Sequence, residues 1–215
     1  MDGIDISHWQ GGISWPAVAG VVKWAYIKAT EHNTWIDPRF RANWANSKSA
    51  GLPRGAYMFF RANVSGVAQA QHFIRTLGSD IGELPPAVDV ETRDGVTSVQ
   101  LTNNLRTCLL EVERLTRKPI IYSSATKWNE LTTRPSWAVE YEWWLAHYSS
   151  LITSPALPVR VTTWLIWQYS SSGRVSGVSG NCDVNRERVS LIDPILTPQQ
   201  LRISKHAEAI IAEVD

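Results

Sequence analysis

Two acidic residues alternate with two valines within residues 85–91, and this stretch limits the possible folds more than any other part of the chain. Alternation with a period of two is typical of a β-strand. Residues i and i+2 of a strand share a face and lie about 6.5 Å apart. Asp89 and Glu91 are therefore expected to point the same way. Because two neighbouring carboxyl groups cannot both ionise at low cost, the pKa of one should be raised.

A carboxyl group with a raised pKa can donate a proton near neutral pH, while an ionised neighbour stabilises positive charge. This combination suits glycoside hydrolysis, in which the transition state resembles an oxocarbenium ion. An amphipathic strand with two solvated acids explains the seven residues equally well, since acids are common on surfaces. The rest of the chain has to decide between these interpretations.

Strand-like and helix-like segments alternate about five times along the chain. Strand patterns fall at residues 3–7, 23–30, 54–60, 85–91 and 119–123, and the helical patterns that follow them fall at 15–20, 37–51, 65–77, 97–117 and 125–131. Three strand patterns with little helical signal follow, at 141–148, 163–170 and 182–185. Repeated strand–helix units imply parallel strands with right-handed crossovers, and about eight such strands close into a barrel. We therefore predict an α/β fold, an irregular TIM-like barrel of five β/α units followed by three strands.

The chain is expected to form one catalytic barrel and a short tail. The barrel should occupy residues 1–193, because no linker interrupts the pattern before Leu191. Residues 194–215 carry isoleucines at helical spacing and are expected to form a helical tail. An isolated helix of this length is marginal in water, so the tail should pack on the barrel or on another chain.

Four acidic residues are expected to meet at one mouth of the barrel. Functional residues of such barrels gather at the carboxyl ends of the strands. Asp5 lies near the end of the first strand, Asp89 and Glu91 end the fourth, and Asp183 lies on the last strand, beside the first in a closed barrel. Ion pairs with nearby arginines are the structural alternative.

Aromatic and polar side chains on the same strands are candidates for contacts with a substrate. The chain contains 11 tryptophans and 6 tyrosines, more than a core of this size requires, and aromatic faces suit sugar rings. Packing in the core is the alternative for each of them. The candidate substrate-binding residues are Tyr57, Phe59, Tyr122, Tyr148, Trp167 and Gln168.

The composition argues against several other classes of function. A formal net charge of +1 produces no strong field for nucleic acid, and no apolar run of about 18 residues predicts membrane insertion. Cys108 and Cys182 constitute neither a disulfide framework nor a zinc site, and the five histidines lack metal-binding spacing. We therefore expect no metal and no organic cofactor. Four acids at one mouth can in principle hold Mg²⁺ or Ca²⁺, so this expectation needs a test.

Seven short motifs, taken in order, resemble glycoside hydrolase family 25, the lysozymes of the Chalaropsis type. Each motif alone is unspecific, but the ordered set is specific and covers about residues 2–190. The motifs are residues 5–11, 27–31, 55–57, 89–91, 144–148, 167–169 and 180–185. The resemblance implies an irregular barrel of five β/α units followed by three strands, in agreement with the pattern above.

The resemblance also implies an activity and residue roles. Family members cleave, with retention, the β-1,4 bond between N-acetylmuramic acid and N-acetylglucosamine in bacterial peptidoglycan. Position by position, Glu91 matches the general acid, Asp89 its catalytic partner, and Asp5 and Asp183 the other two acids. Tyr57 matches a tyrosine that contacts the sugar near the reaction centre. Met58 departs from the histidine usual after that tyrosine, and this bears on contacts at the cleft wall.

Three other functions are less well supported. A chitinase-like hydrolase of family 18 would carry the pattern Asp-x-x-Asp-x-Asp-x-Glu, and here Leu84 and Ala87 occupy its first two acidic positions. A catalytically inert carbohydrate-binding barrel would not need all four acids. A nucleic-acid binder that combines aromatic and basic residues is disfavoured by the near-neutral charge.

The expected partner is bacterial peptidoglycan and the expected state is a monomer. Residues 1–5 show neither a basic region nor an apolar signal core. This start resembles that of a phage endolysin, made in the host cytoplasm and acting on the bacterial cell wall. A secreted bacterial enzyme whose signal peptide has been removed is the alternative.

Overall fold

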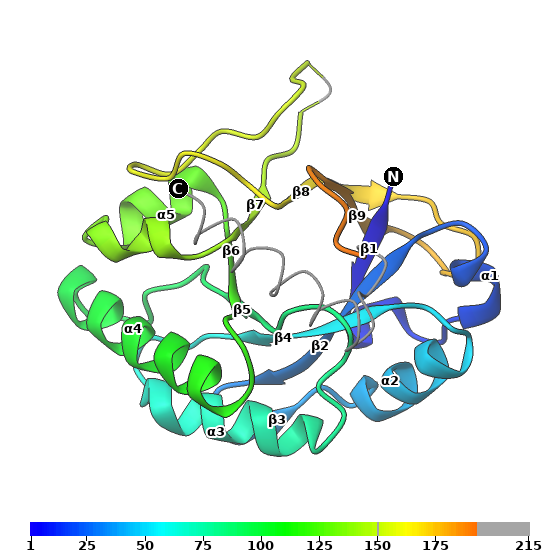
Figure 1. Cartoon of the computed structure of the whole chain (residues 1–215), viewed down its shortest axis with the longest axis horizontal. Helices are drawn as coiled ribbons and strands as arrows, with labels where there is room; N and C mark the ends of the chain where they lie inside the picture. Colours follow the sequence, from blue (N-terminus) through cyan, green and yellow to red (C-terminus); the bar gives the residue numbers. More distant parts are fainter. Residues whose placement is uncertain (150, 193–215) are drawn as a thin grey trace, which may run out of the picture.

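A computed structural model describes residues 1–149 and 151–192 of the chain. The helical tail expected at 194–215 lies outside these residues. Within the described part, eight strands close into a barrel, and a short ninth strand pairs with one of them outside the ring (Figure 1). The strands are β1 (Gly3–Ile6), β2 (Trp24–Glu31), β3 (Trp35–Ile36), β4 (Arg54–Phe59), β5 (Ala87–Asp89), β6 (Ile120–Ser123), β7 (Trp143–Ala146), β8 (Ile166–Gly173) and β9 (Cys182–Glu187).

The barrel closes through pairing of the first two strands. The strand order is β1-β9-β8-β7-β6-β5-β4-β2, and β1 also pairs with β2 in parallel. The strand β3 pairs antiparallel with β2 and stands outside the ring, a small element that the sequence pattern did not predict. The predicted irregular barrel of five β/α units followed by three strands is confirmed.

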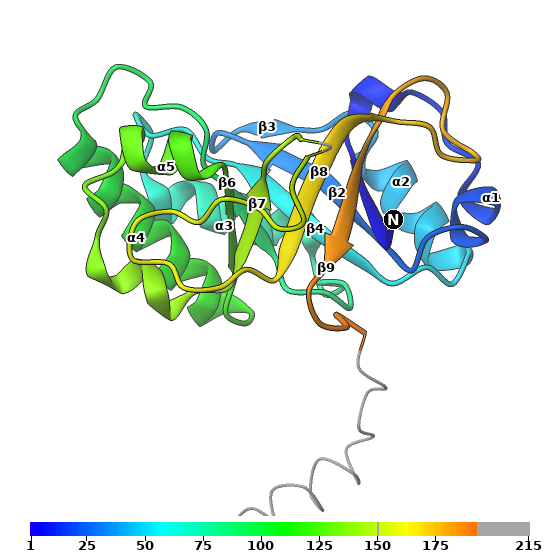
Figure 2. The ribbon, with the colours of Figure 1, turned by 90° about the horizontal axis from the view of Figure 1, so that it is seen from above.

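Five α-helices follow the first five barrel strands. They are α1 (Trp15–Ala19), α2 (Phe40–Ser49), α3 (Gly66–Leu77), α4 (Ser98–Leu115) and α5 (Ala125–Leu131). The predicted capping box at the start of α4 is present, with Thr97 and Gln100 bonded to each other's backbone. Seen from above, α3, α4 and α5 lie on one side and α1 and α2 on the other, while β8 and β9 carry no covering helix (Figure 2).

The last strand departs from the expected parallel sheet. Strand β9 runs antiparallel to both β8 and β1. Only residues 174–181 connect β8 to β9, and a crossover to a parallel strand needs a dozen or more residues. Because β9 is reversed, its first residues lie beside the carboxyl ends of the other strands. Asp183 is thereby placed directly opposite Asp5 in the register.

Large aromatic side chains fill the lower part of the barrel. Trp24, Tyr26 and Trp144 are buried there with Ile120 and Ile166. A Cβ atom at Gly3 would lie 2.2 Å from the Trp24 ring, and one at Gly55 would lie 2.3 Å from the Tyr26 ring. Glycine is therefore required at both positions for the rings to lie across the neighbouring strands. The filled floor leaves the cavity open only at the carboxyl ends of the strands.

A second apolar layer lies between the strands and the helices. Met58 and Cys108 belong to it, with their sulfur atoms 3.9 Å apart. Met58 thus points away from the barrel interior, so its departure from the family pattern does not change the cleft wall, contrary to the expectation above. Both cysteines are buried free thiols. None of the helices within residues 1–149 and 151–192 is long and apolar enough to cross a membrane.

Candidate active site

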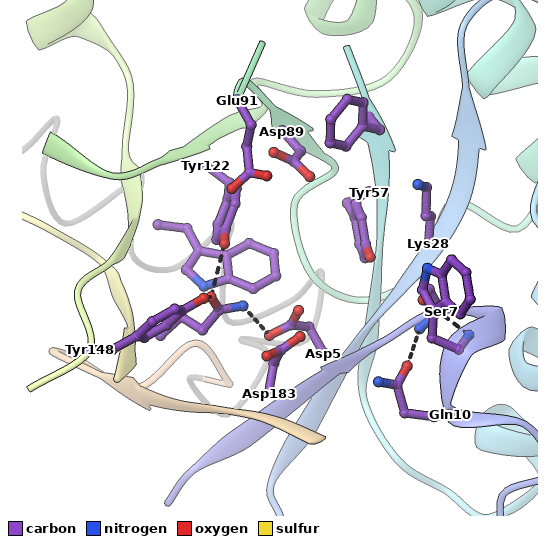
Figure 3. A pocket seen from close by; sticks show the side chains of 14 residues that line it. Asp5, Ser7, Gln10, Lys28, Tyr57, Asp89, Glu91, Tyr122, Tyr148 and Asp183 are labelled. Atoms are coloured by element: carbon purple, nitrogen blue, oxygen red, sulfur yellow. Dashed lines mark hydrogen bonds between the residues drawn. The ribbon is translucent and has the colours of Figure 1, made fainter. Parts of the chain in front are cut away.

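A cleft of about 290 Å³ opens at the carboxyl ends of the barrel strands and holds all four predicted acids (Figure 3). Five of the six candidate substrate-binding residues also line it. These are Tyr57, Phe59, Tyr122, Tyr148 and Gln168. The side chains come from β1, β4, β5, β6, β8 and β9 and from the residues that follow β5 and β7. Strand alternation explains their convergence, because every second residue of a barrel strand faces inward.

Asp5 and Asp183 form a close carboxyl pair on one wall of the cleft. Asp5 Oδ2 accepts hydrogen bonds of 2.8 Å from both Gln168 Nε2 and Asn185 Nδ2. Burial and the neighbouring Asp183 raise the pKa of Asp5 well above its usual value. Burial raises the pKa of Asp183 to about 6. The pair therefore retains a proton at a pH where isolated carboxyl groups have lost theirs.

Gln168 links this pair to two tyrosines. Its Oε1 accepts hydrogen bonds from the hydroxyl groups of Tyr122, at 2.8 Å, and Tyr148, at 2.5 Å. Its amide nitrogen donates to Asp5, so both ends of the amide are engaged. The arrangement fixes the orientation of Gln168 and ties β1, β6 and β8 together at the mouth.

Asp89 and Glu91 occupy the opposite wall of the cleft. Strand β5 ends at Asp89, but Val90 continues the pattern, with its N–H donating to the Tyr122 carbonyl at 2.9 Å. Glu91 therefore points to the same side as Asp89, as predicted (Figure 3). Asp89 is buried, and its Oδ1 has no hydrogen-bond partner among the described residues.

Burial raises the pKa of both carboxyl groups, but the balance differs from the expectation. The pKa of Asp89 is raised well above its usual value by burial and then by the charge of Glu91. The pKa of Glu91 is raised by burial alone, and Lys127, Lys28 and a hydrogen bond with Tyr122 oppose this rise. If Glu91 is the general acid, the spacing of the two acids predicts that Asp89 raises the pKa of Glu91. This prediction is corrected, because the larger rise falls on Asp89, the more deeply buried group.

Lys28 is a cation of the cleft that pattern analysis did not single out. Its Nζ donates to Glu31 at 2.8 Å and lies 4.9 Å from the centre of the Phe59 ring and 5.2 Å from that of Trp35. The charge of Lys28 lowers the pKa of both Asp89 and Glu91. The signal that could have identified it is its position on β2, where spacing by two residues places it on the same inward face as Trp24 and Tyr26.

Trp167 is the one candidate that the structure places outside the cleft. It is only 2% exposed, and its indole N–H donates to the His147 carbonyl at 2.8 Å. Its neighbour Gln168 faces inward, so strand alternation turns Trp167 outward. Trp144 lines the cleft instead, one strand away. The other lining residues that were not predicted as site residues are Ser7, Trp9 and Gln10, all within the first sequence motif.

The arrangement can carry out acid-catalysed bond cleavage with the chain's own groups. It offers protonated carboxyl groups, a buried acceptor oxygen on Asp89 and aromatic walls. Within the described residues, no cluster of three or more histidine, cysteine or acidic side chains has an arrangement that holds a metal ion.

Residues 4–178 match the model of the family described as glycosyl hydrolases family 25. The chain is also 41% identical to lysozyme M1 of Streptomyces globisporus, in a match that covers 86% of this chain and 67% of that protein. The autolytic lysozyme of Clostridium acetobutylicum is 30% identical over 86% of this chain and 55% of its own length.

A solved structure supports the same relationship. The bacterial lysozyme from Streptomyces coelicolor is 36% identical and superposes with a TM-score of 0.79, covering 88% of this chain and 94% of that one.

Proposed function

The chain belongs to glycosyl hydrolases family 25 and is a glycoside hydrolase, and from this premise we propose that it is an N-acetylmuramidase. It cleaves the β-1,4 bond between N-acetylmuramic acid and N-acetylglucosamine in bacterial peptidoglycan and so lyses the cell wall. The observation that carries the proposal is the meeting of Asp5, Asp89, Glu91 and Asp183 in one cleft with aromatic walls. We infer that the enzyme acts at the cell wall as a monomer.

Glu91 is the proton donor of this mechanism. It is half-buried beside the open part of the cleft, where a leaving-group oxygen can reach it. Burial raises its pKa, so Glu91 keeps its proton to a higher pH than an exposed glutamate does. The positive charges of Lys127 and Lys28 stabilise the carboxylate that remains after proton transfer.

Asp89 acts on the positive charge that develops at the anomeric carbon. Asp89 lines the cleft, so its carboxyl group can contact the substrate, while its buried Oδ1 has no partner among the described residues. We favour a route in which Asp89 orients the substrate's own N-acetyl group for attack, as occurs in some glycosidase families. Direct attack by Asp89 is the alternative, and both routes retain the anomeric configuration. Asp89 must ionise during the reaction, and positive charge on the sugar lowers its pKa.

Asp5 and Asp183 shape the cleft around the reacting sugar. They hold a shared proton and, through Gln168, fix the hydroxyl groups of Tyr122 and Tyr148. An inert carbohydrate-binding barrel is disfavoured because burying several carboxyl groups costs free energy, which binding of a neutral glycan does not require.

The identity of the cleaved bond tests this proposal. Purified peptidoglycan is digested, the new reducing ends are reduced with borohydride, and the fragments are identified by mass spectrometry. New reducing-end N-acetylmuramic acid supports the muramidase. Reducing-end N-acetylglucosamine would assign a glucosaminidase instead, and free stem peptides would assign an amidase.

A further inference from the structure

The cleft is smaller than the polymer it has to hold. Its volume of about 290 Å³ is at the lower limit of ligand pockets, which usually measure about 300–1,000 Å³. A glycan strand therefore has to continue beyond the acids and across the rim. The residues at the rim decide how the neighbouring sugars are held.

Trp9 lies at this rim with its side chain in solvent. It lines the same cleft as the acids, yet 82% of its surface is exposed. Its chain neighbours Ser7 and Gln10 lie on the side of the cleft opposite Tyr148, with the acids between (Figure 3). Because exposure of a large aromatic surface is unfavourable, the packing of the core does not explain a tryptophan here.

The indole of Trp9 is held on a rigid support. It belongs to the 3-10 turn His8–Gln10, which is closed by reciprocal hydrogen bonds between Ser7 and Gln10. One face of the ring packs on His8, with centroids 4.5 Å apart and planes inclined by 35°. With so much of its surface exposed, the indole keeps its other face open.

The support extends below His8 into the protein. Asp37 is buried, and its Oδ2 accepts hydrogen bonds from His8 Nδ1 at 2.8 Å and from the His8 backbone N–H at 2.9 Å. The His8 ring also meets the edge of Trp35, with centroids 5.5 Å apart. Asp37 thus fixes His8, and the His8 ring limits the orientations of Trp9 on one side. Fewer free orientations reduce the loss of side-chain entropy on binding.

We propose that Trp9 is the platform of a further sugar-binding subsite, on which a hexosamine ring of the glycan strand stacks one or more residues away from the bond that is cleaved. The open indole face suits the apolar C–H face of a pyranose ring. His8 and Asp37 are positioning residues for this platform. The inference rests on the proposed function, because it takes the strand that lies across the acids to be peptidoglycan glycan.

The dependence of kcat/KM on glycan length tests the subsite. Peptide-free peptidoglycan oligosaccharides of increasing length are digested by the wild type, Trp9→Ala and Trp9→Tyr. The loss caused by Trp9→Ala should grow with length, reach about tenfold on the longest strands and lie mainly in KM. Trp9→Tyr keeps an aromatic face and should retain most of the wild-type value. His8→Ala should show an intermediate loss with the same dependence on length.

Two results would overturn the subsite. One is an equal loss at every length, which would place Trp9 at the reaction centre, and the other is no loss at all. Val139→Ala changes an exposed apolar residue outside the cleft and serves as the control for general surface effects.

Direct binding separates this inference from the proposed function. The same oligosaccharides are titrated into Glu91→Gln and Glu91→Gln/Trp9→Ala by calorimetry. A roughly tenfold weaker Kd in the double variant supports the platform even if the wild type cleaves none of these glycans. Equal Kd values in the two variants would refute the platform whether or not the enzyme is a muramidase.

Discussion

Asp5 of β1 and Asp183 of β9 are direct register partners on antiparallel strands, and burial raises the pKa of both carboxyl groups. Because Asp5 is buried and Asp183 is half-buried beside it, at least one of them is protonated at a pH where both would be ionised in the unfolded chain. The pair therefore reduces the stability of the folded protein near neutral pH. In the proposed function this cost is offset by the role of the pair in shaping the cleft.

Asp183→Asn should stabilise the protein at pH 7.5. The pKa of Asp183 rises from an ordinary 3.8 to about 6 on folding, so the unfolded chain releases its proton first as the pH rises. The folded protein therefore loses stability as the pH rises from about 4 to about 6. Asparagine does not titrate and so avoids this loss. The expected gain in the free energy of unfolding is on the order of 1–3 kcal/mol, or roughly 3–10 °C in Tm. At pH 4 the gain should nearly vanish. Thermal unfolding at the two pH values measures the gain. Equal gains at both would contradict the raised pKa of Asp183.

Gln168→Met should destabilise the protein and reduce its activity at least about tenfold. The hydroxyl groups of Tyr122 and Tyr148 would lose their acceptor, and Asp5 would lose one donor. Leaving buried polar groups without partners costs about 1–3 kcal/mol, which lowers Tm by several degrees. Gln71→Met, which breaks a hydrogen bond to Glu111 between two helices, is the matched control. A Tm no lower than that of the control would show that the tyrosines find other partners.

Arg54→Met should be one of the most destabilising changes in the barrel. Its fully buried guanidinium binds Asp80 and Glu83, and it lies 4.1 Å from the centre of the Trp44 ring. Asp80 and Glu83 are 35% and 41% exposed, so water solvates the charges left unpaired, and the loss of the charge-assisted hydrogen bonds should cost about 1.5–3 kcal/mol. Lys48→Met removes an exposed partner of the same Asp80 and should cost less than about 1 kcal/mol. Similar denaturation midpoints for the two variants would contradict the role of Arg54.

Chelation of divalent metals should leave the activity unchanged. The mechanism draws on carboxyl groups alone, and no step needs a Lewis acid. Activity on peptidoglycan is measured before and after dialysis against EDTA. Loss of activity that returns with Mg²⁺ or Ca²⁺ would show that the acids hold a cation.

The barrel could be predicted from the sequence because its signals are local. Apolar periodicity identified each β/α unit, and the alternation in residues 85–91 showed which side Asp89 and Glu91 share. The direction of β9 could not be predicted in this way, since it depends on the length of the connection from β8. The two-residue strand β3 was missed because it is too short for any periodic pattern.

The candidate site was predicted less completely than the fold. The acids stand at the ends of strands, where the barrel rule applies directly. Trp167 and Gln168 are neighbours on one strand, and the choice of the inward-facing residue depends on a register that no local pattern fixes. Lys28 and Trp9 were not predicted as cleft residues, because their positions depend on tertiary contacts and on a turn that no periodic pattern reveals. Lys28 is paired with Glu31 and enclosed by aromatic rings, and Trp9 lies in a 3-10 turn without periodicity.

The relative pKa values of Asp89 and Glu91 also depend on tertiary structure. Spacing alone shows that the two carboxyl groups are close, but burial decides which of them holds its proton more firmly. Asp89 lies deeper, so its pKa rises further, although the proposed mechanism needs it ionised when substrate is bound. Titration of the substrate-free cleft therefore cannot show which carboxyl group is the proton donor and which one stabilises positive charge. Reaction rates of variants are needed to assign the two roles.

The most direct measurement compares Glu91→Gln and Asp89→Asn on natural glycan and on a substrate with an activated aryl leaving group. General acid catalysis contributes about 10²–10⁴-fold, so Glu91→Gln should lose at least that much on natural glycan. On the activated substrate, which needs no protonation, it should recover a large part of the loss. Asp89→Asn should stay slow on both, because the positive charge at the anomeric centre still lacks its partner. If the activated substrate rescues Asp89→Asn but not Glu91→Gln, the proposed roles are contradicted. Asp89 would then be the proton donor and Glu91 the group that stabilises the positive charge.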